Sequence, residues 1–272
     1  MTTPLLILCI SFALLLLLGV PVAFSIGLSA LATLAYEGLP LEVGFQQMTA
    51  GMSVFSFLAI PFFIFAGELM LYGGIADRIV NFARALIGHV RGGLSMSNVV
   101  ACTLFGGVSG SPVADVSAMG AVMIPMMKKE GYHADYAVNV TTHAALVGAL
   151  MPTSHNIIIY ALAASGKVSI AALILAAILP AVILTLSNLA AAYWVARRRG
   201  YPAGTFPGWH IVARSFAAAL PGLLVVVLIL GGILSGVFTA TESAVVAVLY
   251  ALALTVLVYR SIKWEHFVKA AS

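Results

Sequence analysis

Residues 105–120 read Phe-Gly-Gly-Val-Ser-Gly-Ser-Pro-Val-Ala-Asp-Val-Ser-Ala-Met-Gly. Apolar residues flank this stretch on both sides, yet glycine, serine, proline and the carboxylate Asp115 occupy its centre. This composition predicts a break in a helix, because glycine and proline disfavour helix interiors. Inside a membrane, non-helical backbone persists only where protein or a wet cavity satisfies its polar groups. A broken hairpin of this kind usually marks a binding site.

The composition of the whole chain is that of an integral membrane protein. Of 272 residues, 62% are hydrophobic and 8% are charged, and the mean hydropathy is +1.11. Soluble domains contain roughly 25% charged residues. Runs without a charged residue cover 1–36, 43–67, 92–114, 136–166, 168–196 and 215–241. Since about 20 apolar residues cross the hydrocarbon layer, we expect an all-α polytopic membrane protein with about seven full or broken spans and one re-entrant hairpin.

The charged residues indicate orientation rather than a charged partner. The net charge is +4. The basic clusters lie at the edges of apolar runs, and they are Arg84 and Arg91, Lys128 and Lys129, Arg197 to Arg199, and Arg260 with Lys263. This distribution places them in the cytoplasm, and no nucleic acid is expected as a partner. Cys9 and Cys102 lie in apolar runs and predict neither a disulfide nor a metal site.

The first part of the chain predicts scaffold elements. A first helix, retained rather than cleaved as a signal peptide, runs from about Leu5 to Leu34 with a kink at Val20-Pro21. A second segment, from about Val54 to Tyr72, contains Glu68, which we interpret as an interfacial or paired carboxylate of the scaffold. Apolar residues recur at helical spacing in 75–91, which predicts an amphipathic arm on the cytoplasmic membrane surface.

The stretch quoted first lies within a predicted re-entrant hairpin, 92–129. Both ends of this segment carry basic residues, so both should lie on the cytoplasmic side. Each arm has about 13 residues on its side of the tip Ser109-Gly110-Ser111-Pro112, which is shorter than a full crossing. Asp115 could cap the second arm at its N-terminus, or it could help to hold an ion.

A second interrupted helix is predicted over 134–166. Its break is Pro152-Thr153-Ser154-His155-Asn156, because proline removes a backbone donor and disfavours helix in the residue before it. The hairpin tip needs such a partner, and oxygen atoms of the two breaks would together suit a hard cation such as sodium. His155 and Asn156 are candidates for substrate contact, and His155 is also a candidate pH sensor.

The remaining segment, 167–272, predicts connecting and scaffold helices. One helix runs from about Val168 to Ala196, and a linker follows from Gly200 to Trp209. A span is expected from about Ser215 to Leu234. The turn Thr239-Ala240-Thr241-Glu242 then predicts the start of the last helix, with threonine as its N-cap.

Four motifs, spread in order over almost the whole chain, carry a family resemblance. They are Leu58-Ala59-Ile60-Pro61-Phe62-Phe63 with Ala66-Gly67-Glu68, Ser109-Gly110-Ser111 with Ala114-Asp115, Ile157-Ile158-Ile159-Tyr160, and the segment from Gly232 to Glu242. With these motifs the chain resembles the large membrane subunit, DctM-like, of the tripartite ATP-independent periplasmic (TRAP) transporters. The resemblance implies an elevator-type transporter fold, of which this chain holds the first inverted repeat, with the second repeat absent.

The resemblance also implies a function. It implies a membrane subunit of a secondary transporter in the bacterial inner membrane, which imports small organic anions (C4-dicarboxylates, sialic acid or related carboxylates) by sodium symport. The implied partners are a small membrane subunit, a periplasmic solute-binding protein, the anion itself and the lipid bilayer. No catalytic residue, no cofactor and no metal other than the coupling sodium ion is expected.

The implied organisation has three parts. Residues 1–91 form scaffold helices and the amphipathic arm, 92–166 form half of the transport domain, and 167–272 form connecting and scaffold helices. The sodium or substrate site is expected to comprise Ser109, Gly110, Ser111, Asp115, Pro152, Thr153 and Ser154, with His155 and Asn156 beside it.

Two alternatives stay open from the sequence. Gly107-Val108-Ser109-Gly110 matches the Gly-x-Ser-Gly of rhomboid intramembrane proteases, in which case Ser109 would be the nucleophile and His155 its base. The other alternative is a non-transporting half-subunit, because the chain ends where a second repeat with its own hairpin would follow.

Overall fold

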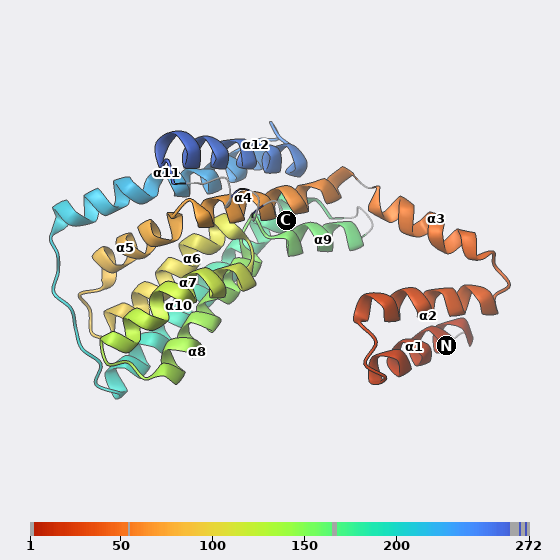
Figure 1. Ribbon diagram of the computed structural model, residues 1–272, viewed down its shortest axis with the longest axis horizontal. Helices are drawn as coiled ribbons and strands as arrows, with labels where there is room; N and C mark the ends of the chain where they lie inside the picture. Colours follow the sequence, from red (N-terminus) through yellow and green to blue (C-terminus); the bar gives the residue numbers. More distant parts are fainter. Residues whose placement is uncertain (1–2, 54, 165–167, 262–266, 268–269, 271–272) are drawn as a thin grey trace. The chain divides into compact units, whose positions relative to one another are not determined.

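The computed structural model describes residues 3–53, 55–164, 168–261, 267 and 270. Within these ranges the regular structure is helical, apart from one isolated bridge between Arg91 and Ala203. Figure 1 shows the helices in chain order, and contacts divide the chain into two compact units, 1–54 and 55–272. The predicted all-α class is confirmed.

The smaller unit contains three helices, α1 (Thr3–Leu17), α2 (Val22–Tyr36) and α3 (Leu41–Met52). Helix α1 folds back and packs on α2, as Figure 1 shows. The prediction of one kinked helix from Leu5 to Leu34 is therefore wrong. Gly19 adopts a φ of 80°, which ends the first helix, and Pro21 directly precedes the second. Each of these helices has 15 residues, fewer than a full crossing needs.

The larger unit contains all the other helices. They are η1 (Phe55–Leu58), α4 (Ala59–Tyr72), α5 (Ile75–Ile87), α6 (Gly93–Ser109), α7 (Pro112–Lys129), α8 (Ala134–Ala145), η2 (Leu146–Leu150), α9 (His155–Ala163), α10 (Ile170–Arg198), α11 (Trp209–Leu234), α12 (Ala240–Ala253) and η3 (Leu254–Val258). Helix α6 lies at the centre of this unit and packs against α4, α5, α7, α8, α10 and α11. The hairpin arm that begins the glycine-rich stretch is thus enclosed by protein.

Fewer helices are long enough to cross a membrane than the sequence predicts. In the part of the chain that the structure describes, four qualify by length and composition: 55–72, 170–198, 209–234 and 240–258. A fifth is formed if the pair α8–η2 and α9, bent by 47° at its break, counts as one span. The prediction of about seven spans is too high, because α1 and α2, which were predicted as one spanning helix, are shorter apolar helices.

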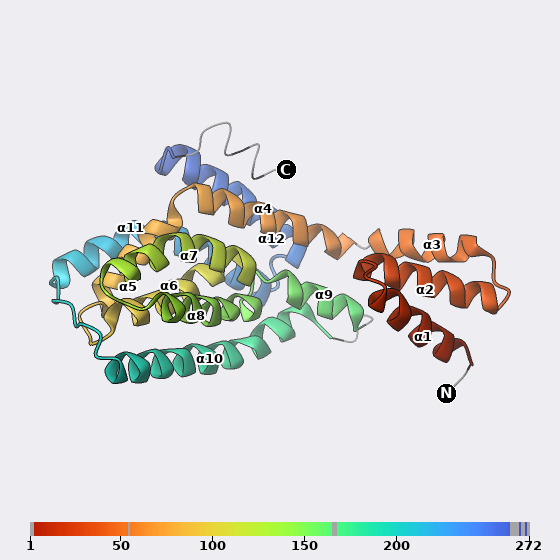
Figure 2. The same cartoon turned by 60° about the horizontal axis from the view of Figure 1, so that its bottom comes forward.

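Helices α6 and α7 form the predicted hairpin, as Figures 1 and 2 both show. The amide nitrogen of Asn98, near the start of α6, lies 3.7 Å from the sulfur of Met127, near the end of α7. The same buried amide donates to the hydroxyl of Thr141 in α8 at 2.6 Å. The arms have 17 and 18 residues, longer than predicted. The base of the hairpin is thus joined to the helix that follows it.

The arm 75–91 is amphipathic, but protein covers its apolar face. Ile75, Ile79 and Val80 of α5 are buried, and α5 packs against α6 and α11. Leu86, an apolar residue near the end of α5, is exposed. Neighbouring helices thus occupy most of the apolar face, and the location of the arm at the cytoplasmic membrane surface stays a prediction.

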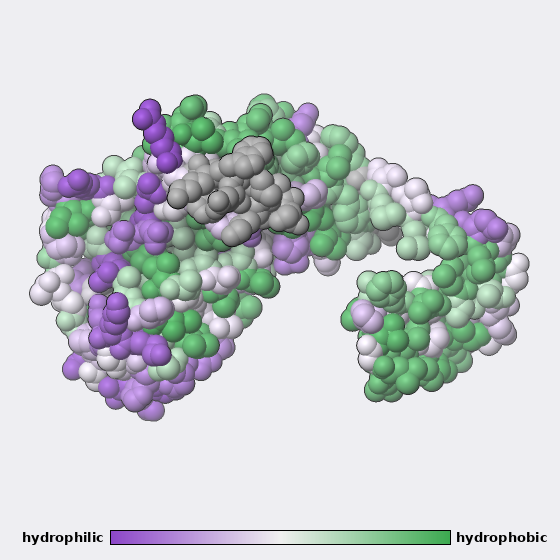
Figure 3. Space-filling view, in the orientation of Figure 1, coloured by the Kyte–Doolittle hydropathy of each residue, from purple (hydrophilic) through white to green (hydrophobic). Residues whose placement is uncertain are grey.

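Three of the basic clusters meet at one end of the larger unit. Arg84 pairs with Glu130, directly after Lys128 and Lys129, at 3.5 Å. The isolated β-bridge joins the backbone of Arg91 to that of Ala203, which lies in the segment that follows Arg197 to Arg199. Figure 3 shows hydrophilic residues gathered at the left of the view, where Figure 1 places the loop between α10 and α11. This common end agrees with the predicted clustering, and its cytoplasmic location stays a prediction.

The ends of the later helices agree in part with the sequence. Residues 200–208 form the expected non-helical linker, but α11 begins at Trp209, earlier than predicted. Thr239 caps α12 in a capping box with Glu242, as the turn sequence predicts.

Three tyrosines stack at the hydrophilic end. The ring of Tyr201 lies 4.1 Å from that of Tyr132 and 5.4 Å from that of Tyr136, measured between centroids. The hydroxyl of Tyr136 donates to the carbonyl oxygen of Ala192 at 3.0 Å, which joins α8 to α10. Burial raises the pKa of Tyr132 to about 12.

We expect alkaline pH to reveal this stack. A folded-state pKa of about 12 lies above the unfolded value of 10.0, so unfolding releases a proton once the pH exceeds 10. The stabilisation is complete below pH 10 and is lost as the pH rises to about 12. In Tyr132→Phe the free energy of unfolding should therefore fall less steeply with pH across this window. The slopes of the two proteins should differ by up to about 1.4 kcal/mol per pH unit. Thermal unfolding midpoints of the purified protein at pH 9 to 12 measure this, and parallel curves for the two proteins would contradict it.

Candidate functional site

The hairpin tip is built by its glycine, serine and proline. Gly110 ends α6 with a φ of 62°, and its N–H donates to the carbonyl oxygen of Gly106 at 2.8 Å. Pro112 is the first residue of α7, and the hydroxyl oxygen of Ser111 caps this helix by accepting from the N–H of Ala114 at 3.4 Å. The predicted tip is confirmed, and Ser111 rather than Asp115 is the N-cap.

Asp115 lies in the first turn of α7 and is 0% exposed. One carboxylate oxygen accepts a hydrogen bond from the hydroxyl group of Ser109. The oxygen of this hydroxyl group in turn accepts a hydrogen bond from the N–H of Ser111 at 3.2 Å. The other oxygen, Oδ2, has no hydrogen-bond partner among the residues that the structure describes. A carboxylate that is buried with one oxygen unsatisfied is costly unless a proton or a cation completes it.

Two glycines shape the space around that oxygen. A Cβ atom at Gly148, in η2, would lie 2.5 Å from Oδ2 of Asp115, and one at Gly106, in α6, would lie 2.8 Å from it. Any other residue at these positions would displace the carboxylate. The carboxylate thus occupies a socket formed by α6, α7 and the end of the α8–η2 segment.

The two breaks predicted from the sequence meet. The hydroxyl of Thr153 donates to the carbonyl oxygen of Gly107 at 3.1 Å. Gly110 lies so close to the Thr153 carbonyl that a Cβ atom would overlap it. Pro152, Thr153 and Ser154 are all buried. The predicted partnership between hairpin tip and broken helix is confirmed as a contact, while the ion-binding role of these residues stays a prediction.

His155 and Asn156 occupy different places. Ser154 caps α9 by accepting the N–H of Asn156 at 3.3 Å, so both residues lie in the first turn of α9 rather than in the break. His155 lines a cavity of about 100 Å³ together with Ser109, Ser111 and Glu68. Asn156 is exposed and lines a separate cavity, of about 300 Å³, against α10. The structure therefore brings His155 to the tip and directs Asn156 away from it.

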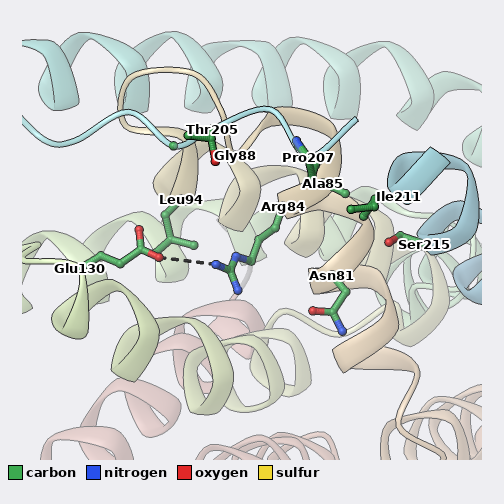
Figure 4. A pocket seen from close by; sticks show the side chains of 11 residues that line it. Asn81, Arg84, Ala85, Gly88, Leu94, Glu130, Thr205, Pro207, Ile211 and Ser215 are labelled. Carbon is green, nitrogen blue, oxygen red and sulfur yellow. Dashed lines mark ion pairs between the residues drawn. The ribbon is translucent and has the colours of Figure 1, made fainter. Parts of the chain in front are cut away.

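A larger cavity lies at the hydrophilic end and contains none of the predicted site residues. It has about 540 Å³ and lies between α5, the end of α7 and the segment before α11. Figure 4 shows Glu130 directed at Arg84 across it. Because these charges already neutralise each other, this cavity offers less reason for a bound ion than the tip does.

The tip could bind a small hard cation. Sodium prefers several oxygen ligands, and the socket presents an unsatisfied carboxylate oxygen beside serine hydroxyl groups. No group of three or more histidine, cysteine or acidic side chains that could hold a metal ion occurs within the described ranges. The polar groups that the tip presents are hydroxyl, carbonyl and carboxylate oxygens.

Comparison with known proteins identifies the family. The family "Tripartite ATP-independent periplasmic transporter, DctM component" matches residues 9–272. The chain belongs to this family. It is a multi-pass membrane protein, and its relatives are transporter permeases rather than enzymes.

Three relatives show the range of the family. The chain is 38% identical over 256 residues to the sialic acid TRAP transporter large permease protein SiaM of Vibrio cholerae, covering 94% of this chain and 60% of the relative. It is 36% identical over 262 residues to the C4-dicarboxylate TRAP transporter large permease protein DctM of Rhodobacter capsulatus, covering 91% and 59%. It is 42% identical over 220 residues to the ectoine/5-hydroxyectoine TRAP transporter large permease protein UehC of Ruegeria pomeroyi, covering 81% and 51%. The chain thus spans about 60% or less of the length of these relatives.

The hydrogen bond of Ser109 differs from what the protease alternative requires, because that alternative pairs Ser109 with His155. A serine nucleophile needs a base that accepts its proton, but the hydroxyl of Ser109 donates to Asp115. His155 shares a cavity with Ser109. Since the relatives of the chain are permeases, the rhomboid-like interpretation is set aside.

Sequence reasoning missed three residues of the tip. Gly148 and Gly106 form the socket, and Glu68 lines the cavity instead of pairing within the scaffold. The signal for Glu68 was available, because a carboxylate inside an apolar helix is by default functional. Gly148 carried no comparable signal, since its role depends on a neighbour that is 33 positions away in the chain, Asp115.

Proposed function

We propose that this chain carries the hairpin-bearing part of the large membrane subunit of a sodium-driven importer of small organic anions in the bacterial inner membrane. The relatives transport, by their names, sialic acid, C4-dicarboxylates and ectoines. The proposed substrates are accordingly C4-dicarboxylates, sialic acid or related carboxylates. A periplasmic solute-binding protein would deliver the anion, and a small membrane subunit would complete the assembly.

The observation that carries this proposal is the unsatisfied oxygen of Asp115 inside its glycine socket. A carboxylate buried in this way is stabilised by a proton or by a bound cation, and a coupling ion would supply the cation. Alkali cations suit the uncharged oxygens of Ser109, Ser111 and the unwound backbone, so that Asp115 is the charged ligand in the socket.

The contact between the tip and the helix break supports a coupling step. Sodium bound beside Asp115 would fix Ser109 and the tip against Thr153, because these groups belong to one set of contacts. The N-terminal turn of α7 would then be positioned for an anion, since helix N-termini attract negative charge. The loaded unit would move across the scaffold, as an elevator mechanism requires.

Sodium-dependent uptake tests the proposal. The complete transporter that contains this chain, with its small subunit and binding protein, is reconstituted into vesicles and supplied with labelled C4-dicarboxylate, sialic acid or ectoine. Uptake of one of them should need an inward sodium gradient and should fall at least about 10-fold when choline replaces sodium. Ser109→Ala should lower it by roughly 10-fold or more, because a hydrogen bond to a buried charge contributes about 1.5 to 3 kcal/mol.

The matched control is Ser117→Ala. Ser117 is exposed on α7, two residues after Asp115, so its loss should leave uptake near the wild-type rate. Equal uptake in sodium and choline, or full activity of Ser109→Ala, would contradict the proposed coupling site.

A further inference from the structure

Glu68 is a carboxylate within a candidate membrane-spanning segment. It lies in α4, within the candidate span 55–72. No described residue forms an ion pair or a hydrogen bond with its side chain. A carboxylate inside a membrane-spanning segment is costly, so its presence calls for a role.

Contact between α4 and the hairpin holds Glu68 beside the tip. A Cβ atom at Gly67 would lie 3.3 Å from the Cα of Ser109, so the two backbones pack closely at this point. Glu68 follows directly in the chain and lines the cavity that Ser109, Ser111 and His155 also line. The backbone of Glu68 is therefore held at the level of the tip by this packing.

The size and charge of this cavity limit what can occupy it. Its volume of about 100 Å³ is well below the roughly 300 Å³ or more of pockets for organic ligands. It has space for a few water molecules, each of which takes about 30 Å³. The charge of Glu68 also repels an organic anion. The occupant that the cavity suits is a small monovalent cation with part of its water.

The cavity and the socket of Asp115 share one residue. Ser109 lines the cavity, and its hydroxyl donates to Asp115. Ser109 is thus common to the cavity and to the socket. The two carboxylates lie on different helices, α4 and α7, and only Asp115 is fully buried.

We infer that Glu68 is a second cation-binding residue at the hairpin tip, which draws sodium into the cavity from which the ion passes Ser109 to Asp115. The inference rests on the proposed sodium coupling and adds a residue to it from outside the hairpin. Glu68 attracts the ion through its charge without having to coordinate it directly, because the cavity lets the ion keep part of its water.

The test is the sodium dependence of Glu68→Gln, which removes the charge and keeps the shape. Sodium is titrated against choline at constant ionic strength, and the thermal midpoint of the detergent-purified complete transporter is read beside the initial rate of uptake. In Glu68→Gln the half-saturating sodium concentration should rise about 3- to 10-fold in both measurements. Uptake at saturating sodium should stay within about 2-fold of wild type.

Two further variants make the test specific. Glu242→Gln removes a carboxylate from the exposed start of α12 and should leave the sodium titration unchanged. Glu68→Asp keeps the charge and should give a titration closer to wild type than Glu68→Gln does. An unchanged titration in Glu68→Gln, or equal impairment of Glu68→Asp and Glu68→Gln, would overturn the inference.

The outcomes separate this inference from the proposed function. If the wild-type protein responds to sodium and Glu68→Gln responds identically, the role of Glu68 is refuted and sodium coupling stands. If the wild-type midpoint and uptake are both indifferent to sodium, the proposed function and the role of Glu68 are both refuted.

Discussion

Replacing Asp115 with asparagine should abolish sodium-dependent uptake while making the sodium-free protein more stable. Asparagine keeps the size of the side chain and removes its charge. Loss of a buried ionic partner costs about 3 to 5 kcal/mol, so the apparent affinity for sodium should fall at least about 100-fold. Without sodium, the variant no longer buries a charge at this position, and the free energy of unfolding should rise by about 1 to 3 kcal/mol.

A variant that is more stable without sodium and yet has lost uptake cannot simply be misfolded. The measurements are the thermal midpoint with and without sodium and the uptake rate of the reconstituted transporter. Asp77→Asn is the matched control, because Asp77 also lies in the first turn of a helix but is exposed. Sodium stabilisation that survives in Asp115→Asn would show that the ion binds elsewhere.

Replacing Gly110 with alanine should have the largest structural effect in the hairpin. A φ of 62° costs a residue with a side chain about 1 to 2 kcal/mol. The added methyl group would also overlap the carbonyl of Thr153, and overpacking costs about 1 to 3 kcal/mol more. We expect a total loss of about 2 to 5 kcal/mol, with separation of the tip from the helix break and loss of uptake.

Gly131→Ala separates the two causes. Gly131 has a φ of 84°, but a Cβ atom there meets nothing within 4 Å, so this variant carries the backbone cost alone. Its thermal midpoint should fall less than that of Gly110→Ala, and its uptake should persist. Equal midpoints for the two variants would show that the close approach to Thr153 contributes nothing.

The hairpin and the broken helix were predictable because the residues that end helices do so locally. Gly110 ends α6, Pro112 begins α7, and Pro152 interrupts the helix that follows. Glycine readily adopts a positive φ angle, and proline has a fixed φ angle and no N–H donor. These are properties of the residues themselves and do not depend on their surroundings. Contact between the hairpin tip and the helix break was predicted because the tip needs a partner, and the structure shows this contact.

The first helix shows where local reasoning failed. The apolar run from Leu5 to Leu34 contains only Val20-Pro21 as an obvious interruption, which predicts a kink. The chain instead reverses, because Gly19 supplies the positive φ that one proline cannot. Whether a glycine beside a proline ends a helix or merely bends it depends on packing, here that of α1 on α2.

The candidate site was predictable in its residues and not in their arrangement. Asp115 was singled out as a buried charge, but its partner Ser109 and the glycine socket depend on how three helices meet. The role of Glu68 depends on the approach of α4 to the tip. Such contacts join residues that are tens of positions apart, and no periodicity in the sequence reports them.

The bond between Asn98 and Thr141 anchors the base of the first hairpin arm, α6, to α8. It is buried, and breaking it would leave an amide without a partner, at a cost of about 1 to 3 kcal/mol. At the tip, by contrast, one hydroxyl of Thr153 holds α6 to the helix break. The hairpin is therefore anchored to α8 at its base, while a hydrogen bond joins its tip to the helix break. We expect the ion to reach its site when the tip moves away from Thr153 and the base keeps its contacts.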